Sequence, residues 1–179
     1  MAVSRTGSGA RSWWGRAASL VALLAGLTAW PAAAQFDTGI AVGAKAPPIT
    51  VTDLEGKPVD LGQYIGKRPV LLEFWASWCD LCKELLPSLK DVERTYGDRV
   101  VRIGINITVN DSRERVRRYL ERHQPPFLTL YDEQGIGSRA YDVPTTSYIV
   151  VIDASGTVVY TGTGGEQDLV AAAGKGLGK

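Results

Sequence analysis

The chain has 179 residues, with 20 basic and 19 acidic side chains and a formal net charge of +1 at pH 7. This balance gives no indication of nucleic-acid binding, which favours a clustered basic surface. With only two cysteines, Cys79 and Cys82, the bridge framework of a small disulfide-rich scaffold is excluded. The pair is therefore predicted to serve chemistry, either redox exchange or, as the alternative, metal binding.

The first residues have the organisation of a secretory leader. Three arginines and no acidic residue precede a mostly apolar stretch, 17–30, and the small residues 32–34 offer a cleavage site. We predict a signal peptide over residues 1–34. A retained membrane anchor is the alternative, although the stretch falls short of the roughly 20 apolar residues that a spanning helix needs. Both interpretations place residues 35–179 outside the cytoplasm, in the bacterial periplasm or on the outer face of the membrane.

Residues 35–179 are long enough for one domain with a real core and too short for two. The leader holds three of the 20 basic residues and no acidic one, so 17 basic and 19 acidic residues remain. An extended arm is expected first, and then a β-hairpin. Its strands, 49–52 and 58–61, flank a turn at 53–56 that contains aspartate and glycine.

The segment 69–87 joins a predicted strand to a predicted helix. Residues 70–75 are apolar except for Glu73, which is typical of a central strand covered on both faces. After Trp78, apolar residues recur every three or four positions, as one buried helix face requires, and Gly97 is expected to end the helix. The residues of this face are Leu81, Leu85, Leu89, Val92 and Tyr96.

Cys79 therefore falls at a helix N-terminus, with Cys82 one turn inside the helix. Unpaired backbone N–H groups and the positive end of the helix dipole lower the pKa of Cys79 and make it the nucleophile. Cys82 is placed to attack a mixed disulfide formed at Cys79. A disulfide that closes so short a loop adds little stability in the chain-entropy model, so a structural bridge is the poorer interpretation.

The sequence Trp-Ala-Ser-Trp-Cys-Asp-Leu-Cys-Lys at 75–83 resembles the active-site segment of thioredoxin-fold proteins. It is more narrowly similar to the extracytoplasmic TlpA/ResA-like thiol–disulfide oxidoreductases, and the resemblance covers about residues 40–172. Four flanking segments also match, at 42–48, 54–57, 141–143 and 152–156. The resemblance implies an α/β thioredoxin-like fold, a central mixed sheet flanked by helices, with an N-terminal β-hairpin extension. It implies a redox-active Cys79–Cys82 disulfide and no separate cofactor. A metal site is disfavoured by the number of ligands, since zinc needs about four and only His123 remains beside the two cysteines.

The resemblance also implies roles for the neighbours of the cysteines. Many relatives keep an acid at the position of Glu73, where it serves in deprotonating Cys82. Burial in an apolar strand independently predicts a raised pKa for this carboxyl, and an ion pair with Lys67 or Arg68 is the alternative. The residues expected to contact substrate on the helix side are Trp78, Asp80 and Leu81, whereas Trp75 is expected in the core.

Relatives place a cis-proline opposite the cysteines, commonly within Pro-Thr-Thr. Pro144 begins such a sequence here. Alignment on Tyr141 and Ile152, however, puts Ser147 at the proline's position and Pro144 three residues early. We expect Ser147 there, with Pro144 as the alternative, and Thr146 beside them in the substrate groove.

The remaining elements alternate between strands and helices. Two strands joined by a helix are expected to pair in parallel, with the helix as a right-handed crossover between them. Either Asp111 or Ser112 is expected to cap the first of the two later helices. The strand at 127–131 is expected at a sheet edge or to begin late because two prolines precede it. The tail from Gly174 is expected to be loose. The predicted elements are strand 100–105, helix 113–123, strands 127–131, 148–152 and 157–160, and helix 167–173.

Three functions stay open. The leading one is an exported oxidoreductase that reduces disulfides in exported proteins, such as the apocytochromes c of some relatives, with electrons from a membrane thiol carrier. No basic residue between the cysteines offsets Asp80, which opposes a thiolate at Cys79 and so favours a reductant. A peroxiredoxin-like peroxidase is the second, although its Pro-x-x-x-Thr-x-x-Cys motif would need proline and threonine where Leu72 and Ala76 stand. A metal or haem chaperone is the third.

Overall fold

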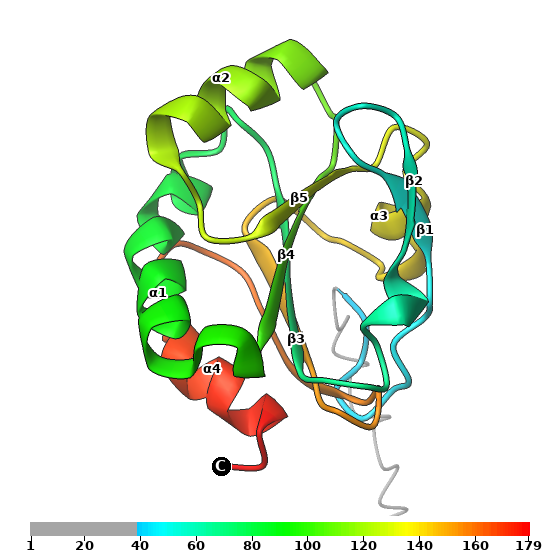
Figure 1. The fold of residues 1–179 in the computed structure, drawn as a ribbon, viewed down its shortest axis with the longest axis vertical. Helices are drawn as coiled ribbons and strands as arrows, with labels where there is room; N and C mark the ends of the chain where they lie inside the picture. Colours follow the sequence, from blue (N-terminus) through cyan, green and yellow to red (C-terminus); the bar gives the residue numbers. More distant parts are fainter. Residues whose placement is uncertain (1–38) are drawn as a thin grey trace, which may run out of the picture. The chain divides into compact units, whose positions relative to one another are not determined.

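The computed structural model describes residues 39–179. The predicted leader, 1–34, lies outside the described residues. Seven strands form one sheet in the order β2-β1-β5-β4-β3-β6-β7 (Figure 1). The strands are β1 (Thr50–Thr52), β2 (Pro58–Asp60), β3 (Val70–Trp75), β4 (Val101–Asn106), β5 (Leu128–Tyr131), β6 (Tyr148–Ile152) and β7 (Val158–Gly162). The helices are α1 (Asp80–Tyr96), α2 (Arg113–His123), α3 (Ile136–Ala140) and α4 (Leu169–Gly176).

The sheet is mixed, as predicted. Strand β3 pairs in parallel with β4 and antiparallel with β6, and β4 pairs in parallel with β5. Helix α1 forms the crossover between β3 and β4. The strand and helix predicted within 69–87 are therefore confirmed, and so is the N-terminal hairpin, whose strands β1 and β2 pair antiparallel. Among residues 39–179, no helix combines the length and the apolar character that crossing a bilayer requires.

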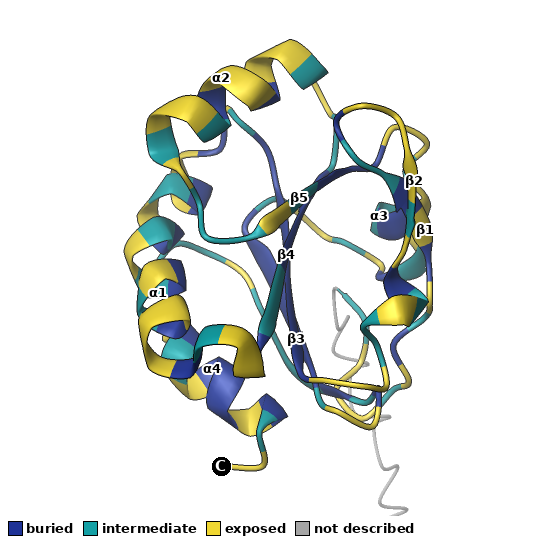
Figure 2. Ribbon diagram, viewed as in Figure 1, coloured by how far each residue is buried: buried dark blue, intermediate teal, exposed yellow. Residues whose placement is uncertain are grey.

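Every residue of strand β3 is buried (Figure 2). Alternate residues of the strand point to opposite faces of the sheet and belong to different cores. Leu71 faces α1 and α4, and Trp75 packs with residues of α2. Leu72 and Phe74 face the opposite way, toward the hairpin and the loop residue Tyr141. Helices α1, α2 and α4 thus lie on one face of the sheet and α3 on the other (Figure 1). This arrangement explains a strand sequence without polar alternation.

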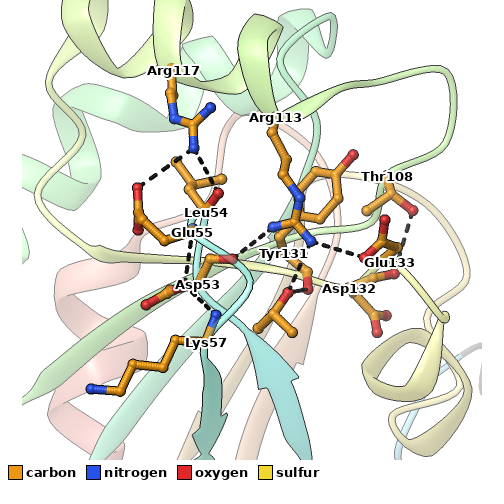
Figure 3. A network of polar contacts seen from close by, with 11 residues as sticks. Asp53, Leu54, Glu55, Lys57, Thr108, Arg113, Arg117, Tyr131, Asp132 and Glu133 are labelled. Carbon is orange, nitrogen blue, oxygen red and sulfur yellow. Dashed lines mark hydrogen bonds and ion pairs between the residues drawn. The ribbon is translucent and has the colours of Figure 1, made fainter.

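The N-terminal hairpin is joined to α2 by two arginines (Figure 3). Arg113 donates a hydrogen bond to the carbonyl oxygen of Asp53 at 2.8 Å, and its guanidinium lies 4.4 Å from the centre of the Tyr131 ring. Arg117 donates to the carbonyl oxygen of Leu54 at 2.7 Å. These contacts satisfy carbonyl groups of the hairpin turn and position α2 above the end of the sheet where the cysteines lie.

Two expectations about local structure were wrong, and a third was right in one of its two alternatives. Leu81 is 46% exposed, because the first turn of α1 extends past the sheet and the buried face of the helix begins at Cys82. Strand β5 begins at Leu128, which confirms the predicted late start, and it lies between β1 and β4, so the alternative of an edge strand is wrong. Gly174 and Gly176 of the tail belong to α4, and a Cβ atom on Gly176 would lie 3.1 Å from a methyl group of Val151. The short helix α3 was not predicted.

Candidate active site

Cys79 and Cys82 are joined by a disulfide at the N-terminus of α1, where the sequence places them, with their Cα atoms 5.3 Å apart. Cys79 is the N-cap residue, and its Sγ accepts a hydrogen bond from the backbone N–H of Cys82 at 3.1 Å. Cys79 is 4% exposed and Cys82 2% exposed. When the disulfide opens, the same N–H group and the helix dipole are available to stabilise a thiolate at Cys79.

Glu73 is buried on the face of β3 that also carries Trp75, within the layer that holds the cysteines. Burial raises its pKa to about 8, and its Oε1 atom has no hydrogen-bond partner. The alternative of an ion pair with Lys67 or Arg68 is wrong, since neither pairs with Glu73. Burial, and secondarily the charge of Glu73, raises the pKa of Tyr119 to about 12. At pH 7 this carboxyl is therefore mostly protonated, with roughly a tenth of it ionised and able to accept a proton, and its pKa lies near the range useful for proton transfer.

The surface beside the disulfide is apolar. Trp78 and Val109 are 45% and 55% exposed, and the indole N–H of Trp78 donates to the carbonyl oxygen of Val109 at 2.7 Å. Leu81 adds a third exposed apolar side chain. Trp75, by contrast, is buried with its ring 4.9 Å from that of Tyr119, which confirms its place in the core. Sequence reasoning missed Val109, which a loop far along the chain brings to this surface.

Asp80, the charged residue between the cysteines, is paired. Lys83 donates to its Oδ1 atom at 2.7 Å. The hydrogen bond and the charge of Lys83 lower the pKa of Asp80. No basic residue lies between the cysteines, as the sequence shows, but the counter-charge of Asp80 comes from Lys83, directly after Cys82.

Ser147 lies immediately before β6, one position beyond the pair formed by Phe74 and Tyr148. It is buried and has a positive φ of 60°. Its position is at the end of the sheet where β3 leads into the cysteines. Pro144 lies three residues upstream and is exposed, and Thr146 between them is partly buried. The φ of 60° at Ser147 is one that a proline ring, which fixes φ near −65°, does not allow. The assignment of Ser147, and not Pro144, to the proline's position stays a prediction.

A second segment holds Ser147 in place. Its Oγ accepts a hydrogen bond from the N–H of Gly164 at 3.1 Å, and its carbonyl oxygen accepts one from the Gln167 side chain at 3.2 Å. Gln167 also donates to the carbonyl oxygen of Gly164 at 2.7 Å. Residues 163–167 and the first turn of α1 line an open groove of about 470 Å³. The groove is lined by Leu81, Glu84, Thr163, Gly164, Gly165, Glu166 and Gln167.

Sequence reasoning missed Gln167 and the glycines of the groove as site residues. They follow β7 in a region without a local motif, and only the fold brings them to Ser147. Within residues 39–179, no three His, Cys, Asp or Glu side chains lie close enough together to hold a metal ion. The reactive groups that the described part of the chain brings together are the disulfide and the carboxyl of Glu73.

A disulfide at the start of the helix that follows the central strand of a mixed sheet defines the protein as a thioredoxin-fold thiol–disulfide oxidoreductase. The chain belongs to the Redoxin family, whose model matches residues 41–176. It is 32% identical over 158 residues to the thiol–disulfide oxidoreductase ResA of Geobacillus kaustophilus, covering 86% of this chain and 90% of that protein. The resemblance to ResA-like proteins is thereby confirmed.

Solved structures give the same result. A secreted Mycobacterium tuberculosis disulfide oxidoreductase, homologous to E. coli DsbE, superposes with a TM-score of 0.62 at 27% identity, covering 72% of this chain and 96% of that one. A thiol:disulfide interchange protein DsbE from Chlorobium tepidum has a TM-score of 0.66 at 24% identity, covering 77% and 96%, and supports the fold alone.

Proposed function

We propose that the protein acts outside the cytoplasm and reduces disulfides in exported proteins, using Cys79 as the nucleophile and Cys82 as the resolving thiol. Two observations support the location: the leader-like sequence at 1–34 and the similarity to a secreted disulfide oxidoreductase. The observation that carries the chemistry is the position of Cys79 as the N-cap of α1, with its sulfur next to the N–H of Cys82.

The reaction follows from this geometry. The thiolate of Cys79 attacks one sulfur of the partner's disulfide, so a mixed disulfide forms and the partner's other sulfur leaves as a thiolate. Cys82, after losing its proton, attacks the Sγ of Cys79. The Cys79–Cys82 disulfide forms, the partner's second thiolate leaves, and two electrons have passed to the partner.

Glu73 is suited to accept the proton of Cys82 during this second attack. It is buried in the same layer, and its unpartnered Oε1 is available as an acceptor once the carboxyl is ionised. Its pKa of about 8 lies near that of an ordinary thiol, so a proton moves between the two groups at little cost.

The substrate surface is proposed to consist of the apolar residues beside the disulfide together with the groove next to Ser147. Trp78 and Leu81 are exposed enough to contact a docked segment. Thr146 and Ser147 precede β6, and Ser147 is hydrogen-bonded to Gly164 and Gln167, which line the groove together with Leu81. Exported proteins with disulfides, including apocytochromes c, are the partner class that the resemblance implies. Because the compartment is oxidising, the dithiol would need recharging by a membrane thiol carrier.

The proposed direction of electron flow, from this protein to its partner, depends on weak stabilisation of the Cys79 thiolate. Within residues 39–179, the one hydrogen bond that Cys79 Sγ accepts comes from the Cys82 N–H. No arginine or histidine adds to it, and the charge of Lys83 is shared with Asp80. A strong oxidant owes its high potential to a very stable thiolate, so we expect a potential nearer the roughly −270 mV of thioredoxin than the roughly −120 mV of a periplasmic oxidant.

Equilibration with glutathione redox buffers tests this proposal. A reductase requires a potential well below that of protein disulfide isomerase. A value above roughly −180 mV would refute the proposed direction while leaving the exchange chemistry of the cysteine pair intact.

A further inference from the structure

The segment that follows β4 is bound closely to the residues that lead into the disulfide. The N–H of Ile107 donates to the carbonyl oxygen of Trp75 at 3.0 Å, and the Trp78 indole donates to Val109. Two residues of this segment, Thr108 and Asn110, have positive φ angles of 63° and 50°. Such conformations are costly for residues other than glycine and persist where surrounding contacts fix them.

The side chain of Asp111 adds two further contacts between this segment and the active-site loop, both to Ser77. Its Oδ2 accepts the backbone N–H of Ser77 at 2.7 Å, and its Oδ1 accepts the Ser77 hydroxyl at 2.7 Å. The Asn106 amide and the N–H of Ser112 complete the set at 2.9 and 3.0 Å. The sequence offered Asp111 or Ser112 as the cap of α2. Ser112 is the N-cap, with its hydroxyl accepting the N–H of Arg115, so the carboxylate of Asp111 is directed toward the active-site loop instead.

We propose that Asp111 is a positioning residue for the exchange reaction, acting through Ser77 on Cys79. While the disulfide is closed, the covalent bond to Cys82 holds Cys79. Once a mixed disulfide has formed, that bond is absent and the position of Cys79 depends on the loop 76–79. Cys82 is carried by α1, so the rate of its attack depends on how well this loop holds the sulfur of Cys79 within reach.

The test uses the full-length protein and an aromatic disulfide, 5,5′-dithiobis(2-nitrobenzoate). Capture by Cys79 releases one coloured thiolate, and attack by Cys82 on the mixed disulfide releases the second, so the two steps are followed separately. Asp111→Ala removes both contacts to Ser77. Ser77→Ala removes only the hydroxyl contact and leaves the charge of Asp111 unchanged, which makes it the milder variant.

Asp153 offers a matched control at the opposite end of β6. It accepts the N–H and the hydroxyl of Ser155 at 2.8 and 2.7 Å, and the N–H of Thr157 at 2.9 Å. Asp153→Ala therefore removes the same kind of aspartate–serine contact without touching the active-site loop. Denaturant unfolding of the oxidised Asp111→Ala and Asp153→Ala proteins measures how much each substitution lowers the free energy of unfolding.

The rate at which the second coloured thiolate is released is measured as a function of pH. The variants are compared at the plateau of this profile, where the rate no longer rises with pH. Asp111→Ala lowers this plateau by about tenfold, as loss of two hydrogen bonds to a charged acceptor suggests. Ser77→Ala lowers it by less, the double variant no further than Asp111→Ala, and Asp153→Ala not at all. An unchanged plateau in Asp111→Ala would overturn the proposal: with a shifted midpoint Asp111 would act through its charge alone, and with an unshifted midpoint it would have no role in the second step. Equal losses in Asp111→Ala and Asp153→Ala would overturn it too.

Discussion

Lys83 donates a hydrogen bond to Asp80 at 2.7 Å, so the charge between the two cysteines is paired with a charge directly after them. Replacing Lys83 with glutamine leaves the carboxylate without its counter-charge. The thiolate of Cys79 becomes less stable and the reduction potential falls. Asp80→Asn acts in the opposite direction and raises the potential. Because Asp80 is exposed, both shifts are small and shrink as salt is added. Glutathione equilibration of both variants checks this, and shifts of the same sign would show that charge is not the cause.

Reduction should change the tryptophan fluorescence. After removal of the predicted leader, Trp75 and Trp78 are the remaining tryptophans, and Trp75 shares a cluster with both cysteines. A disulfide quenches a nearby indole, so we expect emission to rise when the bond opens. The control is the double variant Cys79→Ser with Cys82→Ser, whose spectrum should not respond to dithiothreitol. Identical spectra of the wild-type protein in its two redox states would contradict this placement.

Glu73 makes stability depend on pH. Its pKa rises from an ordinary value of 4.5 to about 8 on folding, so the folded state keeps a proton that the unfolded state loses first. The stabilisation is therefore fully present below about pH 4.5 and is lost as the pH rises toward 8. Between about pH 5 and pH 8, the wild-type protein should lose roughly 3 kcal/mol relative to Glu73→Gln. Urea unfolding of both oxidised proteins at these two values measures the difference, and parallel pH profiles would disprove it.

Substitution of Glu73 should affect the release of a disulfide partner more than its capture by Cys79. Glutamine at position 73 fills a similar volume but cannot accept the proton of Cys82. At pH 7, we expect Glu73→Gln to slow the release of a trapped partner by about 10²-fold, the lower range for general base catalysis, and to change capture by Cys79 much less. Single-turnover kinetics with a disulfide peptide resolve the two steps. Equal slowing of both would assign Glu73 a structural role.

The sequence predicted what depends on local periodicity and failed where distant segments meet. An uninterrupted apolar run predicted β3, and the helical period after Trp78 placed Cys79 at a helix N-terminus. The same period wrongly buried Leu81, because periodicity does not report where a helix extends past its sheet. The glycine-rich end looked loose, although small residues such as Gly176 are what let α4 pack closely against the sheet.

The parts of the site that were missed are contacts between segments far apart in the chain. Asp111 and Ser77 are 34 positions apart, and Gln167 and Ser147 are 20 apart. Each residue alone is a common surface type, and no spacing rule joins the two members of either pair. Glu73 was recognised because a single charge in an apolar strand is informative by itself.

The central claim is that Cys79 attacks partner disulfides and Cys82 resolves the product, and trapping tests it most directly. Cys82→Ala should accumulate mixed disulfides with exported proteins, released by dithiothreitol and mapped by mass spectrometry to Cys79. The double variant Cys79→Ala with Cys82→Ala should trap none. Adducts that form equally with the double variant, or a Cys82→Ala protein that traps nothing although its thiol reacts with a small disulfide, would contradict the account.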